Sequence, residues 1–193
     1  LPDRSALAEA HRSLAYAEGE LGRFDEAHTH LTEALALFEA LGDRDGQART
    51  HLAAAWAATR RQRTSDALAH SRSALRLFRN TGNHVGLARA FNGIGWSLAQ
   101  LGNSQAIRYC RQAVAAHRET GDRYGEAASW DSLGYAQHCF GHHTQALTGY
   151  HRALAIHRTD DDYGDQAVVL AQLWCDHNGR CRGSCSEVQL GLD

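Results

Sequence analysis

The sequence predicts an all-α protein, a right-handed superhelical solenoid built from antiparallel helix pairs. Helix-forming residues dominate the 193-residue chain, and no segment alternates between apolar and polar residues with a period of two. The single proline is Pro2, so no later segment carries a helix breaker. A short glycine-containing motif returns about every 40 residues, which indicates stacked repeats of one supersecondary unit.

The repeated motif marks the junction between one helix pair and the next. It reads Leu-Gly-Asp-Arg-Asp-Gly, Thr-Gly-Asn-His-Val-Gly and Thr-Gly-Asp-Arg-Tyr-Gly at residues 41–46, 81–86 and 120–125, with a shortened copy at 160–164. The first glycine of each full copy can end a helix in the left-handed conformation, and these are Gly42, Gly82 and Gly121. The next residue can cap the following helix by accepting backbone N–H bonds, and these are Asp43, Asn83 and Asp122.

A second break divides each repeat into a helix A and a helix B. It contains Gly22, Gly102 or Gly141, whereas the second repeat has Arg-Arg-Gln-Arg at 60–63 and no glycine. The predicted repeats span 5–46, 47–86, 87–125 and 126–164. Residues 165–174 are expected to form helix A of an incomplete fifth repeat, followed by an irregular tail at 175–193.

The tail carries a group of potential zinc ligands at Cys175, His177, Cys181 and Cys185. Their spacing matches no common zinc module, so a disordered tail is the preferred interpretation. The abrupt change in composition also suggests a truncated or frame-shifted repeat. Because the chain starts at Leu1 and has no methionine, we expect it to be part of a longer protein.

Small residues recur where helices must approach closely. On helix A they are Ala15, Ala55, Gly95 and Gly134; on helix B they are Ala27, Ala67, Ala106 and Ala146, then Ala34, Ala74, Ala113 and Ala153. Large apolar residues beside them are expected to fill the core, among them Leu14, Ile94 and Leu133 on helix A. A unit of this size cannot bury its own apolar face, so stability must come from stacking on its neighbours.

This pattern resembles the tetratricopeptide repeat, through Leu14-Ala15, Ile94-Gly95 and Leu133-Gly134 on helix A and the paired alanines on helix B. The 40-residue period is similar to that of Pins-like adaptors and of the C-terminal arrays of actinobacterial STAND-type transcriptional regulators. The phrase His-Arg-Glu-Thr-Gly-Asp-Arg-Tyr-Gly-Glu-Ala at 117–127 resembles the latter. All 20 basic residues are arginine, as in a high-GC, actinobacterial genome. The resemblance covers about residues 5–173 and implies that helix A lines a concave groove for a protein or peptide ligand.

Four aromatic residues follow the helix A signature at the same position: Tyr16, Trp56, Trp96 and Tyr135. The resemblance points them into the groove, where aromatic rings offer a large contact area. The alternative is that they pack between adjacent A helices as core. Further groove positions implied by the resemblance are Glu9, Arg12, Glu20, Arg49, Leu52, Thr59, Arg60, Arg89, Asn92, Gln100, Asp131 and His138.

Several function classes are disfavoured. A net charge of -2 argues against direct nucleic-acid binding, and no apolar run is long enough to span a membrane. No phosphate loop, nucleophile elbow or His-Glu-x-x-His motif is present, so no enzyme activity, cofactor or metal site is predicted. Most histidines are interpreted as helix B surface residues, such as His28, His30, His70, His117, His151 and His157. The cluster of His138, Cys139, His142 and His143 near one turn could hold a metal, but an exposed turn is the preferred interpretation.

The sequence therefore predicts a cytoplasmic scaffold that binds a protein or peptide, as the sensing or assembly part of a bacterial transcriptional regulator. The alternative is a structural spacer that holds its parent protein inactive by packing against the other domains, with no separate ligand. Contact with other domains of the parent chain is compatible with both hypotheses.

Overall fold

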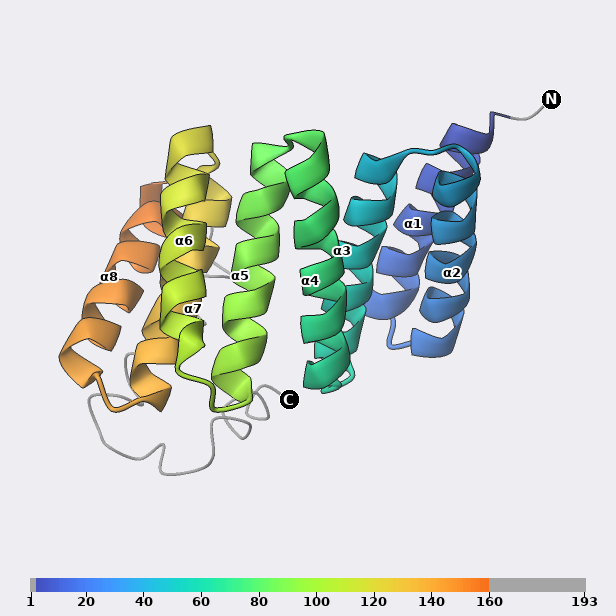
Figure 1. Ribbon diagram of the computed structural model, residues 1–193. Helices are drawn as coiled ribbons and strands as arrows, with labels where there is room; N and C mark the ends of the chain where they lie inside the picture. The colour runs from blue at the N-terminus through green and yellow to red at the C-terminus, as the bar shows by residue number, and fades with distance from the viewer. Residues whose placement is uncertain (1–2, 160–193) are drawn as a thin grey trace. The chain divides into compact units, whose positions relative to one another are not determined.

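The computed structural model describes residues 3–159, and all regular secondary structure in this range is helical (Figure 1). The eight helices are α1 Arg4–Glu20, α2 Phe24–Ala40, α3 Arg44–Arg60, α4 Thr64–Thr81, α5 His84–Gln100, α6 Gln105–Thr120, α7 Arg123–Cys139 and α8 His143–Thr159. The predicted all-α class is confirmed. The shortened motif, the expected fifth helix A and the cysteine-rich tail lie outside the described residues. None of the described helices is long and apolar enough to cross a membrane.

Odd-numbered helices are the predicted A helices and even-numbered helices the predicted B helices. Helices α1, α3 and α7 each turn back along the B helix that follows, and α2 then packs on α3, as α6 does on α7 (Figure 1). The chain divides into two compact units, residues 1–94 and 95–193, with the boundary inside α5. The units are described separately below.

The tight turns depend on one residue in the left-handed backbone conformation. Between repeats this residue is glycine, as predicted, with φ of 66°, 71° and 70° at Gly42, Gly82 and Gly121. The turns within repeats use Gly22, Gly102 and Gly141 in the same way. In the second repeat, which lacks this glycine, Gln62 adopts φ of 58°. The turn is therefore kept without its usual residue, at the steric cost that a Cβ atom brings to this conformation.

Replacing Gln62 with glycine should stabilise unit 1 by about 1 kcal/mol, because relief of the left-handed strain exceeds the added freedom of the unfolded chain. Gln62 is exposed, so the substitution removes no core contact. The reciprocal variant Gly22→Gln should destabilise the protein by a similar amount, since open space surrounds this glycine and only its φ of 74° opposes a side chain. Urea unfolding of both variants measures the two effects. Equal stability of Gln62→Gly and wild type would contradict the strain argument.

The predicted caps between repeats are present. The side-chain oxygen Oδ1 of Asp43, Asn83 and Asp122 accepts a hydrogen bond from the backbone N–H three residues later, at 2.8, 2.8 and 2.9 Å. Each bond satisfies an N–H in the first turn of an A helix that has no partner within that helix. The cap therefore fixes where each A helix begins.

The second glycine of the motif is required by packing. A Cβ atom at Gly46 or Gly86 would overlap the ring of Phe38 or Phe78, each of which is fully buried near the end of the preceding helix B. In unit 2 His117 takes the same place against Gly125 and is 1% exposed. The interpretation of His117 as a surface residue is therefore wrong, because it occupies the repeat position of a core phenylalanine. His157, in the corresponding place on α8, is also buried.

Replacing Gly86 with alanine should destabilise unit 1 by about 1–3 kcal/mol, because the new methyl group would overlap the Phe78 ring. The sign is diagnostic, since alanine in a helix without such a contact gains stability over glycine. The double variant Gly86→Ala/Phe78→Leu should lose less stability than the sum of the two single variants. Additive losses in chemical denaturation would show that the ring does not require the glycine.

The small residues meet the prediction, since Ala15, Ala27, Ala34 and their counterparts in later repeats are buried. Ile94 and Leu133 are core residues, with 1% and 4% exposure. Leu14 is an exception at 46% exposure. It lies on α1, which no described helix precedes, so the face that a neighbouring repeat would cover remains exposed.

Candidate functional site

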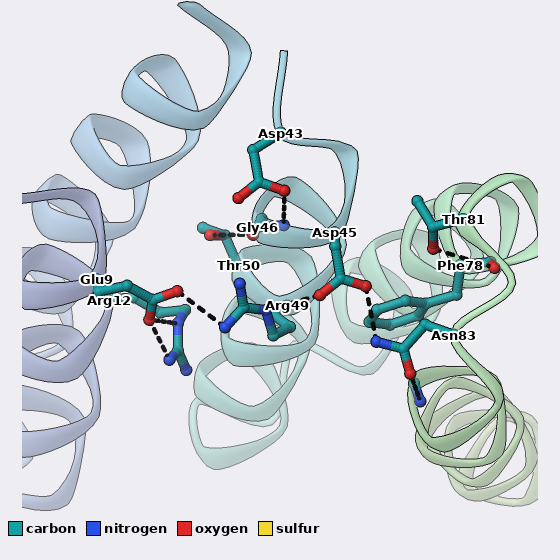
Figure 2. Close-up of polar contacts among 11 residues, drawn as sticks. Glu9, Arg12, Asp43, Asp45, Gly46, Arg49, Thr50, Phe78, Thr81 and Asn83 are labelled. Atoms are coloured by element: carbon teal, nitrogen blue, oxygen red, sulfur yellow. Dashed lines mark hydrogen bonds and ion pairs between the residues drawn. The ribbon is translucent and has the colours of Figure 1, made fainter. Parts of the chain in front are cut away.

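A chain of polar contacts crosses the A helices of unit 1 (Figure 2). Arg12 donates from Nε to Glu9 Oε2 at 3.1 Å on α1, and Glu9 Oε1 lies 2.8 Å from Arg49 Nη1 on α3. Arg49 Nε lies 3.0 Å from Asp45 Oδ2, and Asp45 Oδ1 accepts from Asn83 Nδ2 at 2.7 Å. We call these five residues the polar ladder. It joins α1, α3 and the capping residue of α5.

The ladder presents a charge-balanced surface. Its two arginines alternate with two carboxylates, and the Arg12 and Arg49 side chains are 21% and 39% exposed. The Arg49 Nε–H is buried and is not aligned for a hydrogen bond, so its contact with Asp45 is an ion pair without a directed N–H bond. Asn92 Oδ1 on α5 is likewise buried and has no hydrogen-bond partner. Ser71 Oγ on α4 is a third such buried atom in unit 1. Hydrogen-bonding capacity left unused in this way is costly unless a further partner satisfies it.

Two aromatic side chains of unit 1 lie between α1 and α3. The ring centroids of Tyr16 and Trp56 are 5.0 Å apart and tilted by 49°, and both rings pack on a core that includes Ala15 and Leu31. Both side chains are partly buried and keep some exposed surface. Burial raises the pKa of Tyr16, and the nearby positive charges of Arg12 and Arg89 partly oppose that rise. The pair therefore contributes to the core and also offers ring surface.

A second contact between α1 and α3 lies beside this aromatic pair. Arg60 lies over the Trp56 ring, 5.6 Å from its centroid, and Arg60 Nη2 is 3.4 Å from Glu20 Oε2 on α1. The Arg60 guanidinium thus packs on one face of the Trp56 indole while it forms an ion pair with Glu20.

The aromatic pair of unit 2 is more deeply buried. Trp96 and Tyr135 stack with centroids 4.6 Å apart, but Tyr135 is only 5% exposed and burial raises its pKa to about 12. Trp96 is only partly buried and supplies most of the pair's accessible surface. Asp131 is half-buried near Cys110, where burial first and this carboxylate second raise the pKa of the thiol to about 12.

The structure therefore separates the predicted groove residues into two sets. Unit 1 brings together Arg12, Arg49, Tyr16 and Trp56, with Leu52 half-buried on α3 and Arg89 exposed on α5. Unit 2 holds Trp96, Tyr135 and Asp131. Asp45, and the hydrogen bond that Asn83 donates to it, were not predicted from the sequence. A signal was present, because Asp45 and Arg49 are four residues apart on one helix face.

Two histidine pairs were also missed. His11 and His30 face each other with 2.9 Å between their Nδ1 atoms, and His51 and His70 repeat this arrangement in the next helix pair at 3.1 Å. The two histidines of each pair are 19 residues apart in the sequence, one on helix A and one on helix B. This repeated separation could have been found in the sequence. Burial, with the charges of His70 and Arg76, lowers the pKa of His51 to about 4, and burial also lowers the pKa of His70.

The folded protein should lose stability as the pH falls from about 6.5 to 4, in part through His51. The pKa of His51 is lower in the folded than in the unfolded chain, so its neutral form supports the fold above the unfolded pKa of about 6.5 and this support is lost on acidification. His51→Phe introduces phenylalanine, the residue at the equivalent position of the third repeat, Phe91. This variant should flatten the pH dependence of stability between pH 6.5 and 4. NMR titration should give His51 a midpoint near 4, whereas a midpoint near 6.5 would contradict the account. The exposed His151→Phe serves as the control.

The helix pairs are similar to those of known proteins. Residues 6–80 match the tetratricopeptide repeat family. BtubC (BKLC) from P. vanneervenii has a similar structure, with a TM-score of 0.74 at 21% identity over 91% of this chain and 74% of that one. A STAND protein with a tetratricopeptide repeat sensor from Pyrococcus horikoshii gives 0.74 at 17% identity, over 92% and 28%. Rap protein complexed with Competence and Sporulation Factor gives 0.75 at 18%, over 88% and 48%. No match is found among curated protein sequences.

Because all three identities are below 25%, these likenesses establish the fold alone. The chain spans about half of the Rap protein and about a quarter of the STAND protein. Each of these two proteins is therefore similar to this chain over only part of its own length.

Proposed function

We propose that this chain, which belongs to the tetratricopeptide repeat family over residues 6–80, is a scaffold that binds a protein or peptide segment on the A-helix face of unit 1. The polar ladder is the observation that carries the proposal. It places two partly exposed guanidinium groups at fixed positions on adjacent helices, beside the partly buried Tyr16–Trp56 pair.

The chemistry of this face suits an extended peptide. Arginine can bind carboxylate or carbonyl oxygens through parallel N–H bonds, and an asparagine amide can accept from a peptide N–H while it donates to a peptide carbonyl. The buried Asn92 Oδ1 and Arg49 Nε are groups that a ligand could satisfy after a small side-chain movement. Tyr16 and Trp56 would hold an apolar side chain of the same ligand.

The balance of charge gives the ligand a mixed character. Each ladder arginine already contacts a carboxylate, so a strongly acidic ligand would have to displace Glu9 or Asp45, while a strongly basic one would meet the arginines. Main-chain groups together with one apolar anchor fit this surface better than a run of like charges. We therefore propose an uncharged or mixed-charge peptide as the ligand.

We further propose that the scaffold is the sensing or assembly part of a larger bacterial regulator that works in the cytoplasm. Support comes from the likeness to the STAND protein, whose repeats are described as a sensor, and to the Rap protein, which was crystallised with Competence and Sporulation Factor. In this setting ligand binding would change how the repeats contact the rest of the parent protein, without chemistry in the repeats themselves.

Selection of a displayed random peptide library on the full chain, followed by isothermal titration, tests the proposal. Arg49→Ala and Trp56→Ala should each weaken the selected peptides at least tenfold, about 1.4 kcal/mol, because each removes a central contact. Arg72→Ala is the matched control, since Arg72 is an exposed arginine on helix B α4 and should leave affinity unchanged. Thermal unfolding of each variant shows whether it remains folded.

Two outcomes would count against the proposal. Peptides that bind wild type and Arg49→Ala equally would place the site elsewhere. A selection that enriches no peptide would favour the spacer alternative, in which the repeats contact only other domains of their parent chain.

A further inference from the structure

Three side chains of the first repeat converge on one point at the surface between α1 and α2. His11 Nδ1 on α1 lies 2.9 Å from His30 Nδ1 and 3.0 Å from Glu33 Oε2, both on α2. The three atoms all lie within 4.8 Å of one another. In the described part of the chain this is the one set of three histidine, cysteine or carboxylate side chains that comes so close.

Hydrogen bonding alone leaves this arrangement incomplete. A neutral imidazole carries one N–H, so a proton on His11 Nδ1 can point to His30 or to Glu33 but cannot serve both well. A proton on His30 Nδ1 instead would leave the lone pair of His11 facing the carboxylate oxygen. A cation at the point of convergence would accept lone pairs from all three atoms at once.

The donor set and its spacing suit a divalent first-row transition ion. Zinc binds imidazole nitrogen and carboxylate oxygen at about 2.0–2.2 Å, so tetrahedral ligand atoms lie about 3.3 Å apart. The two observed separations near 3 Å therefore need to open by only a few tenths of an ångström. Glu33 and His30 are three residues apart on one face of α2, which presents both to α1. The Glu33 side chain is 52% exposed, so water can complete the coordination.

We propose that His11, His30 and Glu33 form a binding site for Zn²⁺ or a similar divalent transition ion, which links helix A to helix B of the first repeat. The sequence patterns predict no metal site, because His11 lies on α1 and His30 and Glu33 lie on α2, so no motif within a single helix brings the three together. The site lies between helices A and B, and its ligands include none of the polar ladder residues. It is therefore independent of the proposed peptide-binding function.

The second repeat provides an internal comparison. His51 and His70 have the same arrangement as His11 and His30, but Ser73 stands where the first repeat has Glu33. This repeat therefore supplies two nitrogen ligands and no carboxylate. We expect it to bind the ion much more weakly, since both a ligand and a negative charge are missing.

Cobalt(II) titration of the full, metal-free chain under reducing conditions tests the site. Cobalt bound by nitrogen and oxygen shows visible ligand-field bands without the near-ultraviolet charge-transfer band that thiolate ligands give, so cysteine binding is recognised separately. Wild type should bind one equivalent with the nitrogen and oxygen signature. Glu33→Gln, which keeps the size of an exposed side chain, should weaken this binding at least tenfold, and His11→Gln should abolish it.

A gain-of-site variant guards against loss through misfolding. Ser73→Glu supplies the missing carboxylate to the second histidine pair and should add a second equivalent with the same spectrum. The proposal is overturned if Glu33→Gln binds cobalt as tightly as wild type, if only the thiolate spectrum appears, or if Ser73→Glu adds no binding. Thermal unfolding without metal should show Glu33→Gln as stable as wild type, so that its loss of binding reflects the missing ligand.

Discussion

The close contact between a buried ring and a glycine on the next helix is the constraint on which the described fold depends. Phe38 packs on Gly46 and Phe78 on Gly86, and within unit 2 His117 packs on Gly125. Because a Cβ atom at any of these glycines would overlap the ring, the two helices can approach closely only where glycine stands. The same glycine donates its backbone N–H to the capping Oδ1 of Asp43, Asn83 or Asp122. One short motif therefore fixes both the start of helix A and its distance from the preceding helix B.

The proposed binding face of unit 1 depends on that spacing. Once α2 is seated on α3, α1 and α3 lie near enough for Glu9 to reach Arg49 and for Tyr16 to meet Trp56. The ladder then continues through Asp45 to Asn83, whose other side-chain atom caps α5. A residue that begins a helix therefore also ends a row of surface contacts. This dual use couples the shape of the face to the packing beneath it.

Features that depend on local backbone chemistry could be predicted from the sequence. The glycines that end helices, the caps that begin them and the alanines between them each obey a rule that involves only a few neighbouring residues. Their spacing then gives the helix pairs, because a repeat that cannot bury its own apolar face must stack. The left-handed conformation of Gln62 could not be predicted in this way, because the surrounding turn imposes it on a residue that does not favour it.

Features that depend on which side of a helix is covered could not be predicted. Leu14 looks like a core residue but lies on an uncovered face, whereas His117 looks like a surface residue but takes the place of a core phenylalanine. The same ambiguity applies to the aromatic position, where Tyr135 is buried while Trp56 keeps accessible ring surface. The histidine pairs needed a comparison across two helices, because no single helix brings their members together.

The indole N–H signals of the tryptophans test most directly whether a peptide ligand binds on the A-helix face of unit 1, as proposed. Trp56 lies on that face, whereas Trp130 in unit 2 donates to Glu126 at 3.2 Å and lies under Arg152. Addition of a selected peptide to the ¹⁵N-labelled chain should shift the Trp56 signal in proportion to occupancy and leave the Trp130 signal in place. A shift of Trp130 with no change at Trp56 would contradict the account.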